Sequence, residues 1–245
     1  MATLSHSVWR ESARWMVRLG RNERPLLLMI LTLSLGAWGF VALADLVMEG
    51  ETHSMDTHLL LSMRAADNPS EPWGPEWVHE MARDLTGLGG TAILTGLSLA
   101  AVGYLALIRK FHLMTFLIVA IGGGIVVSTL LKLGFDRPRP DLVPHGSHVY
   151  TKSFPSGHSM MAAVTYLTLG ALLARIQRRR SQRAYILIIA CLATLAVGAS
   201  RVYLGVHWPT DVLAGWAVGS AWAAACWTVA NLMQRRGDIE GTPSS

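Results

Sequence analysis

Charged side chains are scarce in this sequence. Asp, Glu, Lys and Arg make up 15% of its 245 residues, whereas 51% of the residues are hydrophobic. Soluble domains carry about a quarter charged residues, so the composition excludes an ordinary soluble domain. Several apolar runs are long enough to cross the roughly 30 Å hydrocarbon core of a bilayer as helices. The composition therefore predicts an all-α, polytopic membrane protein.

Cysteines and interdomain linkers are also nearly absent. Cys191 and Cys226 are the two cysteines, and both lie inside apolar runs, where small core residues are more typical than a disulfide or a metal pair. No Gly/Ser-rich or Pro-rich stretch divides the apolar runs, and no internal repeat is evident. We therefore expect residues 1–245 to form a single membrane-embedded domain.

Six apolar runs predict a bundle of six transmembrane helices. They cover about residues 26–47, 88–108, 113–133, 158–174, 184–200 and 212–233. The third run contains Gly122-Gly123-Gly124, which favours close helix packing or a bend over a phosphate loop, because no Gly-Lys-Ser/Thr ending follows. The polar tail, residues 234–245, is expected to be loose.

The N-terminal segment, residues 1–25, has an amphipathic pattern. Arg10, Arg14, Arg18 and Arg21 form one stripe of a helical wheel, with apolar residues opposite. We expect an interfacial helix with its arginines toward anionic headgroups. Recruitment of a lipid and simple orientation of the chain remain alternative roles for this helix.

A water-facing segment, residues 48–87, follows the first span. Eight acidic residues outnumber two basic ones in it. The acidic residues are Glu49, Glu51, Asp56, Asp67, Glu71, Glu76, Glu80 and Asp84. Patterns over residues 55–64 and 76–85 predict two short helices. The carboxylates and histidines of the segment lack a compact ligand spacing, so a solvated surface is expected and no metal site.

Basic residues are distributed unevenly about the six predicted spans, which place both termini on one side of the membrane. That side carries 14 of the 21 Lys and Arg residues. They are Arg10, Arg14, Arg18, Arg21, Arg24, Arg109, Lys110, Arg175, Arg178, Arg179, Arg180, Arg183, Arg235 and Arg236. Because the cytoplasmic loops of membrane proteins carry an excess of Lys and Arg, we expect both termini in the cytoplasm and the protein in an inner or plasma membrane. The same clustering argues against nucleic-acid binding.

Three short charged segments interrupt the apolar runs at one expected membrane level, the extracytoplasmic face. They are residues 132–140, 154–159 and 200–211. Charged groups at a membrane boundary are costly unless they pair with one another or bind a ligand. The convergence of these segments therefore predicts an active site within residues 132–211.

The basic residues of these segments favour an anionic ligand. Lys132, Arg139 and Arg201 supply fixed positive charges, and the planar fork of arginine matches phosphate oxygens. Ser156 and Gly157 open the fourth span, where exposed N–H groups and the positive helix end bind anions. The sequence thus predicts a phosphate-binding site.

Two histidines accompany this cationic group. His207 and Asp211 are four residues apart, and Pro209 is tolerated between them if it lies in the first turn of the sixth span. A carboxylate at this spacing fixes one imidazole nitrogen and leaves the other to react. We expect in-line phosphoryl transfer in which His207 attacks phosphorus and His158 protonates the leaving oxygen.

The order and spacing of these residues resemble the three-part signature of the type 2 phosphatidic acid phosphatase superfamily. The matching positions are Lys132, Arg139-Pro140, Pro155-Ser156-Gly157-His158, Ser200-Arg201, His207 and Asp211. The resemblance implies a helical membrane phosphatase that needs no metal or other cofactor. It assigns His207 as nucleophile, Asp211 as its partner and His158 as the acid. It assigns phosphate binding to Lys132, Arg139, Ser156, Gly157 and Arg201.

Neighbouring residues of these motifs have less specific interpretations. Arg137 repeats the Arg-Pro pair two residues before Arg139, so it is expected either to share the phosphate or to face lipid headgroups. Trp208 and Tyr203 are expected to anchor the chain at the membrane interface. A histidine-containing loop over residues 141–152 is expected at the surface.

The sequence therefore predicts a lipid phosphatase whose partners are a membrane lipid phosphate and the bilayer, with no obligatory protein partner. The family resemblance favours undecaprenyl diphosphate, with phosphatidylglycerol phosphate or phosphatidic acid close behind. A lipid-to-lipid phosphotransferase or a lipid A phosphatase would use the same residues. A carrier or scaffold that binds lipid phosphate without turnover is the alternative of another class, although binding alone needs no nucleophile. Vanadate-dependent haloperoxidases share the signature, but six spans argue against them.

Overall fold

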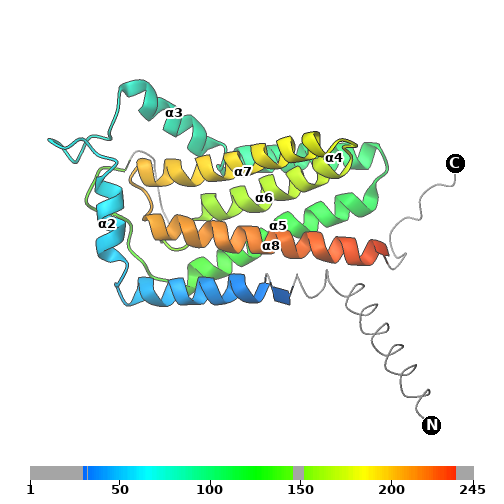
Figure 1. Ribbon diagram of the computed structural model, residues 1–245, viewed down its shortest axis with the longest axis horizontal. Helices are drawn as coiled ribbons and strands as arrows, with labels where there is room; N and C mark the ends of the chain where they lie inside the picture. The colour runs from blue at the N-terminus through cyan, green and yellow to red at the C-terminus, as the bar shows by residue number, and fades with distance from the viewer. Residues whose placement is uncertain (1–29, 32, 146–151, 236–245) are drawn as a thin grey trace, which may run out of the picture.

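The computed structural model of the chain describes residues 30–31, 33–145 and 152–235 (Figure 1). The interfacial helix expected within residues 1–25 and the tail from residue 236 onward lie outside these ranges. Within them, the chain is helical apart from turns, and an isolated bridge joins Arg64 to Pro72. The prediction of an all-α membrane fold is confirmed at this level.

The helices follow the predicted runs closely. The first described helix is Leu33–Met48, and it is followed by α2 (His53–Leu61), α3 (Glu76–Gly87), α4 (Thr91–Leu107), α5 (Phe111–Gly134), α6 (Gly157–Arg175), α7 (Arg180–Tyr203) and α8 (Pro209–Arg235). Both short helices expected between the first two spans are present as α2 and α3.

Four of these helices, α5 to α8, are long and apolar enough to cross a membrane, and up to six spans result if each of two bent helix pairs counts as one. Leu33–Met48 meets α2 at 88°, and α3 meets α4 at 46°. The outer faces are apolar: α5 has a mean hydropathy of 2.3 over a window that is only 22% buried. Exposed apolar surface of this extent is typical of contact with lipid, so the chain is a multi-pass membrane protein.

Helix α6 lies at the centre of the bundle, between α5, α7 and α8 (Figure 1). Small residues allow α8 to approach it closely. A Cβ at Gly215 would lie 2.6 Å from the Ser156 carbonyl oxygen, and one at Gly219 would lie 2.5 Å from that of Met160. The start of α6 and the start of α8 are therefore held together by backbone contact.

The glycine triplet of α5 also serves helix packing, as predicted. A Cβ at Gly123 would overlap the indole ring of Trp222 in α8, and one at Gly124 would lie 2.9 Å from Val164 in α6. The Trp222 indole nitrogen donates to the Ala120 carbonyl oxygen at 2.7 Å. Gly123 and Gly124 therefore let α5 pack closely against α8 and α6, whereas Gly122 makes no close approach.

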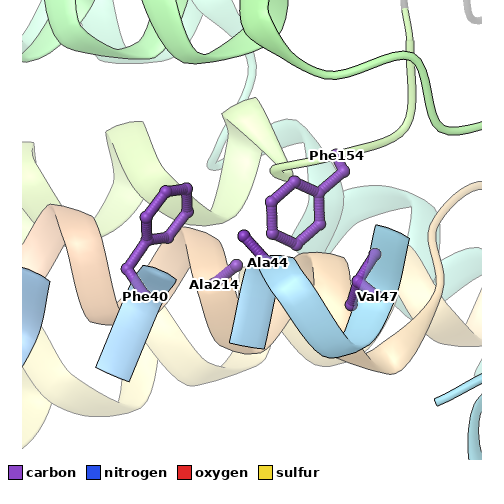
Figure 2. Packing of buried hydrophobic residues seen from close by; sticks show 5 residues of the cluster. All are labelled: Phe40, Ala44, Val47, Phe154 and Ala214. Carbon is purple, nitrogen blue, oxygen red and sulfur yellow. The ribbon is translucent and has the colours of Figure 1, made fainter. Parts of the chain in front are cut away.

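An aromatic cluster fixes the chain that leads into α6. Phe154 is fully buried, stacks on Phe40 with 5.7 Å between ring centroids, and meets Phe135 edge-on at 5.0 Å. Figure 2 shows Phe40 and Ala44 of the first helix beside Phe154, with Ala214 of α8 next to them. Burying a Phe side chain stabilises by about 1.5–3 kcal/mol, so this cluster fixes Phe154 just before the start of α6.

Helix α2 runs across one end of the bundle rather than along it (Figure 1). The chain after it is tied to the end of α7. Arg64 donates to the Tyr203 carbonyl oxygen at 2.9 Å, and the Tyr203 hydroxyl donates to the Trp73 carbonyl oxygen at 2.7 Å. The segment over residues 48–87 is thus partly packed against the helix ends.

Candidate active site

The three charged segments meet at the end of the bundle that α2 crosses (Figure 1). They lie in the last turns of α5 and α7 and at the first turns of α6 and α8. One cavity of about 720 Å³ brings their side chains together. The predicted residues that line it are Lys132, Arg139, Gly157, His158, Arg201 and His207.

His207 and Asp211 form the expected pair. Helix α8 begins at Pro209, so His207 precedes it and Asp211 lies in its first turn. The His207 Nδ1 lies 3.2 Å from the Asp211 Oδ2, and the two residues are 1% and 0% exposed. The other ring nitrogen, Nε2, lies 3.2 Å from the Arg139 Nη1. Arginine can only donate, so both contacts require the tautomer with the proton on Nδ1 and the lone pair on Nε2.

Burial keeps His207 neutral. It lowers the pKa of the imidazole from its usual 6.5 to about 4, and the hydrogen bond and charge of Asp211 offset only part of this. Arg139 and Arg201 lower the His207 pKa further by charge repulsion. At neutral pH Nε2 therefore carries a lone pair, which accepts from Arg139 in this structure.

The Asp211 carboxylate is held on all sides. Its Oδ2 accepts from the Trp208 backbone N–H at 2.9 Å and from the Ser153 hydroxyl, in addition to His207. Its Oδ1 accepts from the Arg137 Nη1 at 2.5 Å. A buried carboxylate with this many donors stays ionised and fixes the orientation of the imidazole.

The predicted phosphate ligands surround the cavity with positive charge. Arg201 is 2% exposed and donates to the Thr86 hydroxyl at 3.0 Å, while Arg139 donates to the Val206 carbonyl oxygen at 2.6 Å. A Cβ at Gly157 would lie 3.1 Å from the Lys132 Cε. Gly157 therefore leaves open space beside the Lys132 side chain.

Ser156 caps α6, and its hydroxyl is used within the helix. It accepts from the Ser159 backbone N–H at 3.4 Å and from the Ser159 hydroxyl at 2.8 Å. Ser156 is fully buried and does not line the cavity, whereas Gly157 and His158 do. The structure thus brings seven of the eight predicted site residues together through their side chains or backbone at the cavity or the His207 pair, and Ser156 lies behind them.

The expectation for Arg137 was wrong. The side chain neither lines the main cavity nor faces headgroups, because it is 8% exposed and pairs with two carboxylates. Its Nη2 lies 2.7 Å from the Asp56 Oδ2, and its Nη1 lies 2.5 Å from the Asp211 Oδ1. The repeated Arg-Pro pair draws attention to Arg137 in the sequence. Its partners, Asp56 and Asp211, could not be read from the pair because both are distant along the chain.

Asp56 is the residue that the sequence analysis missed. It was grouped with the solvated carboxylates of residues 48–87, yet it is fully buried beneath α8. It accepts from the Thr210 backbone N–H at 3.0 Å, from the Thr210 hydroxyl at 2.6 Å and from Arg137. An acidic residue that shares a short helix with apolar neighbours was the one available signal, since ionised groups are rarely buried unless paired.

The expected role of Trp208 as an interface anchor was also wrong. The side chain is 4% exposed, donates to the Pro138 carbonyl oxygen at 3.1 Å and lies under the Arg137 guanidinium at 5.5 Å.

In the loop expected over residues 141–152, the His145 Nε2 lies 2.7 Å from the Pro140 carbonyl oxygen, and neither residue lines the cavity. The expected surface loop is described only up to residue 145 and from residue 152.

Away from its charged end, the cavity is apolar. Its walls come mainly from α4 and α5, and the apolar lining residues are Leu94, Leu99, Val102, Leu117, Ile118, Ile121, Ile125 and Met161. Thr165 adds a polar group among them, and Ser128 adds one near Gly157 at the charged end. A cavity with a cationic end and an apolar body fits an amphiphile whose anionic head lies beside His207.

In the described parts of the chain, no group of three or more His, Cys, Asp or Glu side chains is arranged to hold a metal ion. Asp136, which the sequence places near the cations, pairs instead with Lys152 at the surface.

Comparisons with known proteins converge on one family. Residues 113–235 match the PAP2 superfamily. The chain is 34% identical over 144 residues to phosphatidylglycerophosphatase B of Bacillus subtilis, covering 58% of this chain and 70% of the relative. It is 30% identical over 168 residues to lipid A 1-phosphatase of Rhizobium etli, covering 59% and 68%.

A solved structure extends the similarity to the fold. The transmembrane PAP2 type phosphatidylglycerolphosphate phosphatase of Bacillus subtilis superposes with a TM-score of 0.71 at 26% identity. The match covers 85% of this chain and 98% of that one. It therefore includes far more of the chain than the region that matches the family.

Proposed function

Because the chain belongs to the PAP2 superfamily, it is a hydrolase of the lipid-phosphatase class, and we propose that it removes phosphate from a membrane lipid through a phosphohistidine intermediate. The observation that carries this proposal is the pairing of His207 with Asp211 through Nδ1, which leaves Nε2 at a cavity end that holds three cations. A nucleophile, its orienting carboxylate and charges for phosphate oxygens thus occupy one site.

The first step forms the bond between the His207 Nε2 and phosphorus and breaks the bond between phosphorus and the leaving oxygen. His158, which lines the same cavity, donates a proton to that oxygen. As Nε2 bonds to phosphorus, the imidazole becomes cationic while Nδ1 keeps its proton. The Asp211 carboxylate stabilises this charge across the 3.2 Å contact.

Water completes the cycle. The neutral His158 accepts a proton from water, the water oxygen bonds to phosphorus, and the bond between phosphorus and Nε2 breaks. Phosphate leaves, and His207 returns to its neutral tautomer. Lys132, Arg139 and Arg201 stabilise charge on the non-bridging oxygens in both steps, together with the N–H groups at the start of α6.

The cavity supports a lipid rather than a soluble phosphate ester. Its apolar walls lie between α4 and α5, whose outer faces are exposed to the surrounding lipid. A tail that entered laterally between these helices would bring the phosphate to the charged end without leaving the membrane. Residues 132–211 would then act at the extracytoplasmic face, with both termini in the cytoplasm.

The substrate is proposed by class: a lipid phosphate monoester or diphosphate. The sequence resemblance favours undecaprenyl diphosphate, whereas the names of the two relatives point to phosphatidylglycerol phosphate and lipid A. All of these present a phosphate on an apolar body, which is what the cavity fits.

The test is phosphate release from purified protein in detergent, with a panel of these lipids and EDTA present. We expect EDTA-resistant release from wild type and loss of turnover by at least about 10³-fold in His207→Ala. Arg178→Ala, a charge removed at the other end of the bundle, serves as the matched control. Retained turnover in His207→Ala would contradict the nucleophile, and binding of the lipids without any release by wild type would favour a carrier.

A further inference from the structure

The buried carboxylate of Asp56 has no part in the mechanism above. It lies in α2, outside residues 113–235 that match the family, and 155 residues before Asp211. Burying an ionised carboxylate costs several kcal/mol unless the group is paired. A charge kept at 0% exposure beside the active site therefore calls for a specific role.

Asp56 contacts Arg137, one of the groups that hold the Asp211 carboxylate, and Thr210, the residue before Asp211 in α8. Its Oδ2 accepts from the Arg137 Nη2 at 2.7 Å, and the other guanidinium nitrogen of Arg137 donates to Asp211 at 2.5 Å. Its Oδ1 accepts from the Thr210 backbone N–H at 3.0 Å, in the first turn of α8. The Thr210 hydroxyl connects Asp56 with Arg137, because it donates to Asp56 and accepts from the Arg137 Nη1 at 2.8 Å.

The charges explain why a second carboxylate is useful. If Arg137 faced Asp211 alone, its positive charge would cancel much of the negative potential that Asp211 exerts on His207. Because Asp56 pairs with the other side of the guanidinium, Asp56 balances the charge of Arg137 while Arg137 positions Asp211. Asp211 can then stabilise the imidazolium that forms when Nε2 bonds to phosphorus.

We propose that Asp56 is a positioning residue for phosphoryl transfer, acting through Arg137 and Thr210 to hold the Asp211 carboxylate and to preserve its charge for His207. The proposal rests on the proposed function of His207 as the nucleophile. It extends the site to α2, an element that lies across the helix ends and contributes no residue to the phosphate cavity. Asp56 thus matters in the transition state more than in phosphate binding.

A purely structural role would have different consequences. If Asp56 served only to attach α2 to α8, its loss would lower the folded fraction, and every ligand of the site would be affected alike. A positioning role predicts a selective loss, because interactions that strengthen in the transition state leave ground-state binding unchanged. Inorganic phosphate and orthovanadate separate the two cases, since vanadate accepts a fifth ligand and can bond to the Nε2 of His207.

The experiment compares wild type, Asp56→Asn and Asp67→Asn in detergent. Asp67 is an exposed carboxylate of the same segment, so its variant removes the same charge without the buried contacts. Vanadate and phosphate affinities are measured by calorimetry on monodisperse protein. We expect Asp56→Asn to weaken vanadate about 10- to 100-fold and phosphate less than about twofold, and Asp67→Asn to match wild type for both ligands.

Turnover of the best lipid in the panel should show the same division, with kcat reduced in Asp56→Asn and KM nearly unchanged. Equal loss of both anions, or vanadate affinity equal to that of Asp67→Asn, would overturn the proposal. If Asp56→Asn does not fold, Asp56→Glu is judged by the same two criteria. Because the anion measurements need no lipid, wild type that binds vanadate but releases no lipid phosphate would refute only the proposed function, whereas wild type that binds no vanadate would refute both.

Discussion

Arginines at the two ends of the bundle differ in their surroundings. At the end crossed by α2, Arg137 and Arg201 are 8% and 2% exposed. At the opposite end, in the turn between α6 and α7 and the start of α7, the arginines are exposed. They are Arg175, Arg178, Arg179, Arg180 and Arg183. One residue type thus occurs in two environments separated by the length of the bundle.

The difference teaches what burial demands of a charge. A buried guanidinium needs partners at fixed geometry, and those partners make it informative about mechanism: Arg137 touches two carboxylates, and Arg201 faces the cavity. An exposed guanidinium is satisfied by water and headgroups in many orientations, so its position along the chain matters more than its contacts. The same residue type therefore has fixed partners at one end of the bundle and an open surface at the other.

The largest expected effect comes from the catalytic carboxylate. Asp211→Asn keeps the shape of the side chain but removes its charge, and we expect kcat to fall about 10⁴-fold, as for an amide that replaces the orienting carboxylate of a catalytic histidine. Arg178→Gln at the other end should leave kcat unchanged. Steady-state phosphate release measures both variants, and a loss below tenfold in Asp211→Asn would mean that His207 is oriented by other groups.

The same substitution at both ends tests the role of burial in stability. Arg137→Gln leaves two buried carboxylates facing each other, and breaking a buried pair costs about 3–5 kcal/mol. Arg178→Gln, at an exposed position, should change the free energy of unfolding by less than about 0.5 kcal/mol. Denaturant unfolding in mixed micelles compares the two. Similar small effects would show that the Arg137 pairs contribute little.

Close packing can be compared between the ends in the same way. Gly215→Ala would place a Cβ 2.6 Å from the Ser156 carbonyl oxygen, so we expect a loss of about 1–3 kcal/mol in stability and reduced turnover. Gly103→Ala in α4, where no atom lies within 4 Å of the added Cβ, should be neutral or stabilising by up to about 1 kcal/mol. Thermal unfolding with parallel activity assays distinguishes them. Equal stability would mean that α8 can shift away from α6.

The smallest expected effect is that of mild acid on the nucleophile. With its pKa lowered to about 4 by burial, His207 should stay neutral between pH 7 and 5. Asp211, Arg139 and Arg201 are the charged groups that face it. Because the folded state takes up its proton at lower pH than the unfolded state, this histidine adds stability above pH 6.5 and loses it as the pH falls toward 4.

Histidine NMR of protein in nanodiscs, with His207→Gln to assign the signal, measures that pKa. A titration near 6.5 would contradict the burial argument and would move the acid limb of the activity profile up with it. If His207 titrates near 4, the acid limb of the pH–activity profile must come from the titration of other groups of the site or of the substrate.

The sequence predicted the helices and most of the side chains that meet at the cavity, because both depend on local signals. Apolar runs end where charged residues begin, and the α8 start at Pro209 follows from the limits that proline places on a helix. The spacing of His207 and Asp211 gives their contact directly. The packing role of Gly123 and Gly124 was also readable, since few other functions fit glycines at mid-membrane.

What the sequence did not reveal depends on contacts between distant segments. Asp56 lies 81 residues from Arg137 and 154 from Thr210, and no periodicity links these positions. Composition placed Asp56 among solvated carboxylates, because seven acidic neighbours share its segment. The prediction for Trp208 failed for a related reason. An indole beside a membrane boundary is expected at the interface, but a distant segment with Pro138 and Arg137 covers this one.

The crossing of α2 over the helix ends has a consequence for how the protein is made. Asp56 is synthesised first, Arg137 next, and Thr210 and Asp211 only with α8. Until α8 enters the membrane, the Arg137 guanidinium has one of its two carboxylates, and His207 has no orienting partner. A chain that stops short of α8 therefore carries Lys132 and Arg139, the proposed phosphate ligands, without the contact between His207 and Asp211.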